Sequence, residues 1–274
     1  MERIQAAITK ARATRDAQAD APVQDPARRT SKAPRRPGIQ EAWAALPRIE
    51  PSRRQLAWNR IVTSEGGREA TAFDVMRTRT LQQLREHGWK RLAVTSPSAA
   101  CGKSTVCLNL ALSLVRQPEV SVVLVEMDMR RPSLARTLGM SQKHSVADIL
   151  TGKGSLQDNG VRFGENLALF TMHQAVRNPS DILHGGAVET ALSEIEATYA
   201  PTVMIFDMPP MLVSDDTMAF LQNVDAALMV AAAGTTTIAE IDTCERELAA
   251  STSMMGVVLN KCRYTGKDYG SEYY

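Results

Sequence analysis

The chain has 274 residues, of which 44% are hydrophobic and 23% are charged, and its formal net charge is +2. This length is sufficient for one large α/β domain with appended segments. There is no run of about eighteen apolar residues, and residues 1–21 lack an apolar stretch followed by a cleavage site, so we expect neither a transmembrane helix nor a secretory signal. The four cysteines show no metal-ligand spacing, which is typical of free thiols, and we expect a cytoplasmic protein.

The first 60 residues are basic, with thirteen Lys and Arg against six Asp and Glu, a net charge of +7, so the remainder carries −5. The apolar spacing predicts an amphipathic helix over residues 1–19. Residues 20–60 are expected to form a Pro/Arg-rich linker that is disordered up to residue 38, with a short helix at 40–46 and an extended stretch at 55–62. This arm is either a solvated tail or a contact for an anionic membrane surface or an acidic partner. Nucleic acid is not expected, because no aromatic platform accompanies the charges.

An apolar run at 91–95 is followed by a loop of small residues, by Gly102-Lys103-Ser104-Thr105 and by an amphipathic helix pattern over 103–116. This order predicts a strand, a phosphate-binding loop and a helix whose N-terminal N–H groups face an anion. Lys103 would contact the β- and γ-phosphates, and the Ser104 hydroxyl would bind Mg²⁺. The loop departs from the usual pattern, because Pro97 and Ala100 stand where glycine is favoured.

Two further apolar runs end in carboxylates. Residues 121–126 lead into Asp128, and residues 202–206 lead into Asp207. Continuous apolar runs are typical of strands buried on both faces, and Mg²⁺ prefers one or two carboxylates together with phosphate and water. Asp128 and Asp207 are therefore candidate metal ligands. The alternatives are a surface or capping carboxylate for Asp128 and a turn cap for Asp207.

With these residues, the chain resembles the bacterial tyrosine autokinases of capsular and exopolysaccharide loci, within the deviant P-loop ATPase group. Four stretches carry the resemblance from near Ala72 to Lys261: the loop and helix from Gly102, the run 128–134, the run 178–183, and Asp207-Met208-Pro209-Pro210 with Ser214-Asp215. The resemblance implies ATP and Mg²⁺ as cofactors. It implies nucleotide contacts from Ala100, Cys101, Gly102, Lys103, Ser104 and Thr105, metal binding by Ser104, Asp128 and Asp207, and catalytic roles for Lys103, Glu126, Asp128 and Asp207.

The chain also departs from the family. Glu126 stands where the family has Asp, and would act either as the proton acceptor for a tyrosine hydroxyl or in the metal shell. The family's Glu-x-x-Arg-x-x-Arg stretch, which helps to build its ring, aligns with Thr71, Asp74 and Arg77, so only the last residue is retained. In the resembled ATPases the position of Asn260 lies near the nucleotide base; a core or turn asparagine is the alternative.

Four of the five tyrosines fall in the last eleven residues, which we call the tyrosine tail (residues 264–274). A polar tail without apolar periodicity is expected to be mobile. Its tyrosines are either a chance or docking cluster or, as the resemblance implies, phosphate acceptors. These acceptors would be Tyr264, Tyr269, Tyr273 and Tyr274.

Alternation of strands and helices predicts an α/β fold with a doubly wound, mostly parallel sheet of the P-loop NTPase type. The expected domain spans residues 61–263. Its further elements are helices near 68–87, 145–150, 187–198, 215–222 and 238–250, and strands near 167–171, 225–231 and 256–260.

The function we infer is that of an ATP-dependent protein-tyrosine autokinase that regulates exopolysaccharide polymerisation and export. The resemblance implies a membrane-bound chain-length (co-polymerase) partner, a homo-oligomer, and contact with the membrane through that partner or the basic arm. Two alternatives are an ATP-operated switch of the export machinery without kinase activity, which the altered loop and Glu126 favour, and a nucleotide-binding scaffold without turnover.

Overall fold

The computed structural model describes residues 37–64, 66–141 and 143–262. Eight strands form one sheet in the order β1-β4-β5-β3-β6-β2-β7-β8, in which only β4 and β5 pair in antiparallel fashion. The strands are β1 (Arg48–Ile49), β2 (Arg91–Thr95), β3 (Val122–Glu126), β4 (Gly160–Phe163), β5 (Leu167–Phe170), β6 (Val203–Asp207), β7 (Ala226–Ala232) and β8 (Ser253–Asn260).

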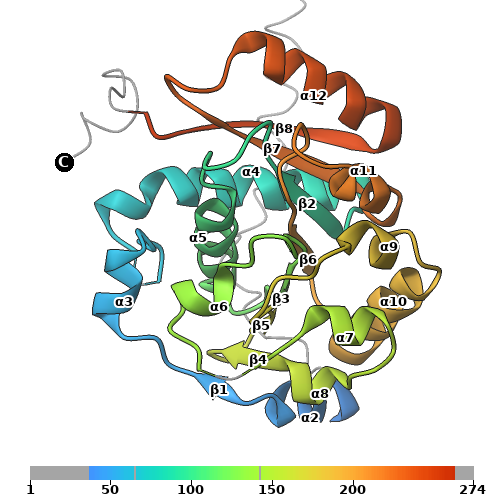
Figure 1. The fold of residues 1–274 in the computed structure, drawn as a ribbon. Coiled ribbons are helices and arrows are strands. Elements are labelled where there is room, and N and C mark those ends of the chain that lie inside the picture. Colours follow the sequence, from blue (N-terminus) through green and yellow to red (C-terminus); the bar gives the residue numbers. More distant parts are fainter. Residues whose placement is uncertain (1–36, 65, 142, 263–274) are drawn as a thin grey trace, which may run out of the picture. The chain divides into compact units, whose positions relative to one another are not determined.

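Helices cover both faces of this sheet (Figure 1). One face is covered by α3 (Arg53–Trp58), α4 (Thr71–His87), α5 (Lys103–Val115) and α6 (Leu134–Thr137). The other is covered by α2 (Pro37–Ala45), α7 (Val146–Leu150), α8 (Leu156–Asn159), α9 (Pro179–Leu183), α10 (Ala187–Tyr199), α11 (Asp216–Phe220) and α12 (Ile238–Ser251). Two short 3₁₀ helices, η1 (Arg68–Ala70) and η2 (Leu221–Asn223), are the remaining elements of the part of the chain that the structure describes.

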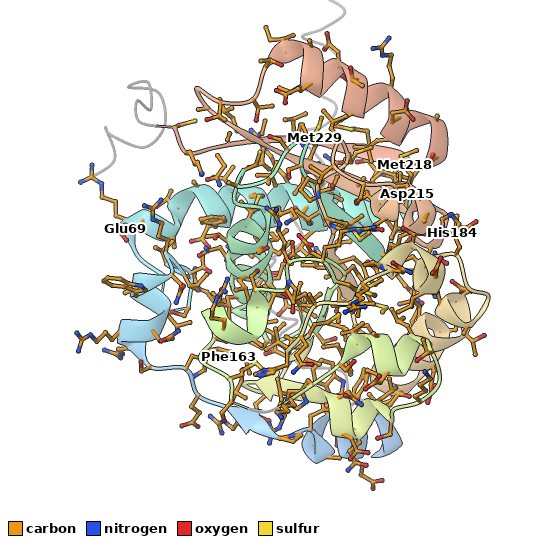
Figure 2. All side chains as sticks on the ribbon, viewed as in Figure 1. Glu69, Phe163, His184, Asp215, Met218 and Met229 are labelled. Atoms are coloured by element: carbon orange, nitrogen blue, oxygen red, sulfur yellow. The ribbon has the colours of Figure 1, made fainter. Side chains whose placement is uncertain are left out.

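Alternation along the central strands divides the core into two clusters. In β6, Ile205 packs on the α5 side, whereas Met204 and Phe206 pack on the α10 side. All five residues of β3 and of β6 are buried, as expected for parallel strands that are covered on both faces. Side chains accordingly crowd both sides of the sheet, including Met229 of β7 (Figure 2).

The predicted doubly wound sheet is confirmed, and β2, β3, β5, β6, β7 and β8 lie where the apolar runs predicted them. The prediction of an extended stretch at 55–62 is wrong. Residues 53–58 form α3, because Ser52 caps its N-terminus and the Gln55 amide donates to the carbonyls of Arg136 and Thr137, at 3.2 and 3.1 Å. The short helix predicted at 40–46 is confirmed as α2.

Residues 37–60 belong to the packed body, although the sequence placed them in a linker. Trp43, Leu46 and Leu56 are at most 5% exposed. The Trp43 indole N–H donates to the carbonyl of Tyr199 at 2.8 Å, and its ring meets the Tyr199 ring edge-on at 5.5 Å. The predicted amphipathic helix at 1–19, the disordered part of the linker and the tyrosine tail lie outside the described residues. Among the helices that the structure describes, none has the length and hydropathy needed to cross a bilayer.

Candidate functional site

The loop between β2 and α5 is a tight turn in which Pro97 and Ala100 stand at positions where glycine is favoured. We call residues 96–105 the P-loop. Ala100 and Gly102 have φ values of 63° and 92°, in the left-handed region that disfavours side chains. Backbone hydrogen bonds hold the loop's first residues to the segment after β6, because Met211 N–H donates to the Ser96 carbonyl at 2.9 Å and Leu212 N–H to the Pro97 carbonyl at 3.1 Å. Tertiary contacts therefore support a conformation that the sequence of the loop opposes.

The P-loop leads into the buried helix α5, which has thirteen residues. Gly102 is its N-cap, and no side chain caps its first N–H groups. A helix N-terminus with free N–H groups and the positive end of the helix dipole is an anion site. Ser104 and Thr105 lie in its first turn, where the sequence placed the nucleotide contacts.

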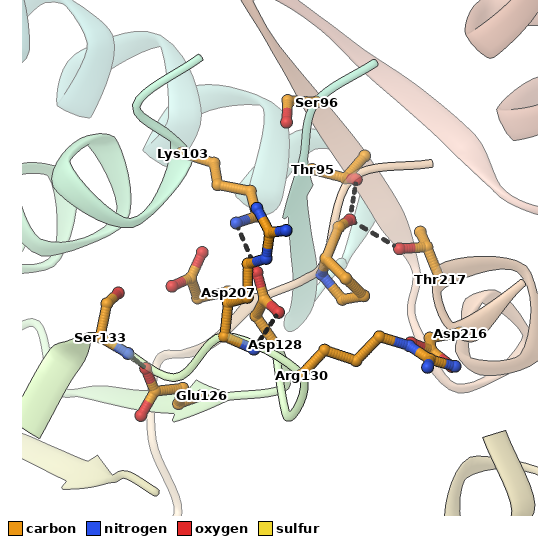
Figure 3. Close-up of polar contacts among 12 residues, drawn as sticks. Thr95, Ser96, Lys103, Glu126, Asp128, Arg130, Ser133, Asp207, Asp216 and Thr217 are labelled. Atoms are coloured by element: carbon orange, nitrogen blue, oxygen red, sulfur yellow. Dashed lines mark hydrogen bonds and ion pairs between the residues drawn. The ribbon is translucent and has the colours of Figure 1, made fainter. Parts of the chain in front are cut away.

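Lys103 forms an ion pair with Asp128 at this helix start (Figure 3). Its Nζ lies 2.7 Å from Asp128 Oδ2, and the two side chains are 12% and 6% exposed. Burial alone would lower the pKa of Lys103, but the charges of Asp207 and Asp128 hold it above its usual value. Asp128 is also fixed by its own backbone, since Met127 N–H and Asp128 N–H both donate to the carbonyl of Asp207, at 2.9 and 3.0 Å.

Asp207 ends β6, between β2 and β3, and its side chain is fully buried. Oδ1 accepts a hydrogen bond from the Cys107 thiol at 3.7 Å, whereas Oδ2 has no partner among the described residues. Burial raises the pKa of Asp207 to about 6, against the opposing effects of the Lys103 charge and the Ser104 hydroxyl. An unpartnered buried carboxylate oxygen calls for an explanation, and a hard cation beside Ser104 and Asp128 would supply its missing partner.

The residues therefore fit Mg²⁺ bound to a nucleotide. The parallel strands β2, β3 and β6 end at the same edge, which brings the P-loop, Asp128 and Asp207 together. Ser104, Asp128 and Asp207 offer the hydroxyl and carboxylate oxygens that Mg²⁺ prefers, and Lys103 with the α5 N-terminus offers the positive groups for phosphate.

The carboxylate of Glu126 accepts hydrogen bonds from three backbone N–H groups. Its Oε1 accepts from the N–H groups of Ser133 and Leu134, and its Oε2 accepts from Met172 N–H at 2.8 Å. The side chain is fully buried, and burial raises its pKa to about 7, although the three N–H groups oppose this. Glu126 thus ties the loop that carries Asp128 to the end of β5, so the geometry favours a positioning role over the predicted roles of proton acceptor or metal ligand.

A second ion pair, which the sequence did not indicate, links the Asp128 loop to α11. Arg130 Nε donates to Asp216 Oδ2 at 2.6 Å and Nη2 donates to Oδ1 at 3.0 Å. Asp216 is 1% exposed and also accepts from the hydroxyls of Ser180, at 2.6 Å, and Ser214, at 2.9 Å. Arg130, Ser180 and Ser214 lay in stretches that carried the resemblance. Ser214 is two residues from Asp216, but Arg130 and Ser180 reach it across 86 and 36 residues, contacts that no local pattern encodes.

The two remaining predicted nucleotide contacts lie against each other. The Asn260 amide donates to the Cys101 carbonyl at 2.8 Å. The Cys101 thiol is 1% exposed and lies 3.6 Å from the hydroxyls of Ser98 and Thr236. Burial raises its pKa, but these hydrogen bonds hold the pKa of Cys101 below its usual value.

Of the predicted acceptors, Tyr264, Tyr269, Tyr273 and Tyr274 lie outside the described residues. The remaining tyrosine, Tyr199, is 2% exposed and packs against Trp43 and Phe170. Burial raises its pKa to about 12. Tyr199 is therefore a core residue.

Comparison with known proteins agrees with this geometry. Residues 89–274 match a family model described as ParA, NUBPL iron-transfer P-loop NTPase. The tyrosine-protein kinase wzc of Salmonella typhi is 31% identical over 184 residues, which cover 65% of this chain and 25% of that protein. The putative tyrosine-protein kinase EpsB of Ralstonia nicotianae is 28% identical over 205 residues, which cover 72% and 26%. The chain thus spans about a quarter of the length of the curated relatives that it matches.

Solved kinase domains share the fold. The kinase domain of the Escherichia coli tyrosine kinase ETK superposes with a TM-score of 0.63 at 26% identity, covering 73% of this chain and 80% of that one. The VpsO kinase domain gives 0.62 at 25% identity, covering 70% and 96%. The resemblance to bacterial tyrosine kinases of exopolysaccharide loci is confirmed, and the chain belongs to the ParA family of P-loop NTPases.

Proposed function

We propose that this chain is an ATP-dependent protein-tyrosine autokinase that transfers the γ-phosphoryl group of ATP to the tyrosine tail. The observation that carries the proposal is the convergence of Lys103, Asp128 and the unpartnered Asp207 oxygen at the N-terminus of α5. The concentration of tyrosines beyond β8 favours a protein acceptor over simple hydrolysis. The burial of Tyr199 further restricts the acceptors to the tail.

Positioning and charge neutralisation do most of the work in phosphoryl transfer. Lys103 would release Asp128 and move to the phosphates, where the α5 N–H groups would orient them. Ser104, Asp128 and Asp207 would hold Mg²⁺, which supplies neutralisation of the phosphate charge. The tyrosine oxygen forms a bond to the γ-phosphorus, and the bond from that phosphorus to the β–γ bridging oxygen breaks, so that ADP leaves.

The phenolic proton needs an acceptor, and Asp128 is our candidate. It is 4% exposed, whereas Glu126 and Asp207 are fully buried. Glu126 is also engaged by three backbone N–H groups. This engagement favours the second candidate function, a switch protein of polysaccharide export that hydrolyses ATP without modifying protein.

We further propose that the protein acts at the cytoplasmic face of the membrane, as a homo-oligomer bound to a membrane-embedded co-polymerase. The names of the curated relatives support the kinase assignment, and the basic residues 1–60 suit an anionic surface.

The test is incubation of the full chain with Mg-ATP, followed by anti-phosphotyrosine detection and calorimetry with ADP. Wild type is expected to accumulate phosphotyrosine. Lys103→Met removes the charge that faces phosphate and should abolish both phosphotyrosine and ADP binding. ATP hydrolysis without phosphotyrosine would favour the switch, and equal ADP affinity in the variant would contradict the assigned site.

A further inference from the structure

Asn260, the last residue of β8, contacts the P-loop although 159 residues separate it from Cys101. Its Nδ2 donates to the Cys101 carbonyl at 2.8 Å. Its own carbonyl accepts from Ala233 N–H at 2.9 Å, and it pairs with Ala232 at the end of β7. Asn260 is thus fixed from one side by β7 and reaches the P-loop from the other.

The asparagine amide also lies close to the α carbon of Gly102. A Cβ atom on Gly102 would collide with Asn260 Nδ2, which could move away only by giving up its hydrogen bond to the Cys101 carbonyl. Gly102 is therefore favoured by its φ of 92°, and a side chain at this position would displace the asparagine amide from its place.

The hydrogen bond also orients a peptide plane. The C=O of Cys101 and the N–H of Gly102 belong to one peptide unit, and no peptide bond among the described residues is cis. In a planar trans peptide these two groups point in opposite directions. Holding the Cys101 carbonyl toward β8 turns the Gly102 N–H away from it.

The side chain of Cys101 is held from the same region. Its thiol lies 3.6 Å from the Thr236 hydroxyl, which itself accepts from Ala232 N–H at 2.9 Å. Two segments beyond the P-loop, the turn after β7 and the end of β8, therefore fix one loop residue through its thiol and its carbonyl. This external support acts next to Ala100, where the loop itself is strained.

We propose that Asn260 is a positioning residue that sets the Cys101–Gly102 peptide so that the Gly102 N–H donates to the nucleotide phosphates. It acts through the backbone of the loop and does not read the base. The proposal rests on nucleotide binding at the proposed site, and it adds a determinant of affinity on the strand that leads into the tyrosine tail.

The experiment measures ADP and GDP affinity of the full chain by calorimetry with Mg²⁺, for wild type, Asn260→Ala, Asn260→Asp and Asn223→Ala. Asn223 is the matched control, because its amide also donates to a backbone carbonyl, that of Phe220 at 3.1 Å, away from the P-loop. Loss of one orienting hydrogen bond should weaken binding of both nucleotides by about tenfold in Asn260→Ala. Asn260→Asp should weaken it further, because a carboxylate would face the Cys101 carbonyl and repel phosphate.

The two possible roles of Asn260, positioning the P-loop and contacting the base, predict different effects on ADP and GDP affinity. If Asn260 positions the loop, Asn260→Ala lowers ADP and GDP affinity by the same factor, and Asn223→Ala has no effect on either. A collapse of the ADP-to-GDP preference would assign Asn260 to the base and overturn the proposal, as would wild-type affinity in Asn260→Ala. If Asn260→Ala does not fold in thermal unfolding, Asn260→Ser, whose hydroxyl is too short to reach the carbonyl, takes its place. Phosphotyrosine formation in wild type is assayed separately. If the wild type binds nucleotide but forms no phosphotyrosine, the proposed function is contradicted and the role of Asn260 in nucleotide affinity is unaffected.

Discussion

Ala100 stores strain in the P-loop. Its φ of 63° lies in the left-handed region, which costs an L-residue with a Cβ about 1–2 kcal/mol. Ala100→Gly should therefore stabilise the folded protein by about 1 kcal/mol, because the relief exceeds the added entropy of glycine in the unfolded chain. Thermal unfolding should show a rise of about 2–4 °C.

The neighbouring Ala99 provides the control, because its backbone lies outside the left-handed region. Ala99→Gly should lower the melting temperature, since it adds only unfolded-state entropy. A lower melting temperature in Ala100→Gly would contradict the assignment of strain.

Asp207 makes the stability of the free protein depend on pH. Its pKa is about 6 in the fold, above the ordinary value of 3.8, so its contribution is fully present below about pH 4 and is lost as pH rises through 6. The linked loss is about 3 kcal/mol at most. Asp207→Asn cannot ionise and should be more stable than wild type at pH 8, with little difference near pH 4.

The measurement is thermal unfolding without nucleotide and with a chelator, at both pH values. The same difference in melting temperature at pH 4 and pH 8 would show that Asp207 is not the titrating group.

At the scale of elements, Glu126 joins three segments: the end of β3, the start of α6 and the second residue after β5. Glu126→Gln replaces one accepting oxygen with an amide that faces backbone N–H, and Glu126→Asp is too short to reach all three donors. Each variant leaves a buried donor unpaired, which costs about 1–3 kcal/mol. Both should unfold at lower temperature and bind Mg-ADP more weakly, because the loop that carries Asp128 is released.

Ser155→Ala is a suitable control, since it removes an exposed cap of α8 far along the chain from Asp128. It should lower stability without changing ADP affinity. Wild-type stability and activity in Glu126→Asp would show that the carboxylate acts by charge alone.

Elements built on long apolar runs could be predicted from the sequence, and those held by distant contacts could not. The buried strands β3 and β6 consist almost entirely of apolar residues, which gives them a local signal. The strand β1 has two residues, and α3 depends on Gln55 reaching carbonyls 81 and 82 residues away. Neither element is therefore marked by a periodic pattern of apolar residues in the sequence.

The candidate site follows the same rule. Lys103 and Asp128 could be placed together because parallel strands end at one edge, and the structure brings them to 2.7 Å. The pairing of Arg130 with Asp216 could not be foreseen, because several acids were available along the chain. The sequence left Asn260 open between a base contact and a core or turn asparagine. In the structure its amide donates to the Cys101 carbonyl, and a backbone acceptor carries no sequence signal.

At the scale of the whole molecule, the proposed acceptors are the tyrosines of the tail, because Tyr199 is buried. Removing residues 264–274 should abolish phosphotyrosine while leaving ADP affinity unchanged, because the described site lies before residue 263. Mass spectrometry after Mg-ATP treatment should place phosphate on Tyr264, Tyr269, Tyr273 and Tyr274. Phosphate found mainly on Tyr199 would contradict both its burial and the proposed reaction.

Assembly should respond to the same modification. Eleven extended residues span up to about 40 Å, enough to reach a neighbouring subunit that packs closely. Each phosphotyrosine adds nearly two negative charges, so a modified tail is repelled from a site that contains Asp128, Asp207 and phosphate. Light scattering should report a larger particle before Mg-ATP treatment than after it, and an unchanged mass would contradict tail docking.

The hydrogen bond from Asn260 connects the P-loop to the end of β8, the strand that precedes the tail in sequence. The chain turns immediately after this residue, since Lys261 has a φ of 60°. Any tension on the tail, as when a neighbour captures one of its tyrosines, is borne first by the end of β8. Such tension would pull Asn260 away from the Cys101 carbonyl and lower the affinity of the same subunit for ADP. In the proposed reaction, capture of a tail by a neighbour would therefore favour the exchange of ADP for ATP in the subunit that carries that tail.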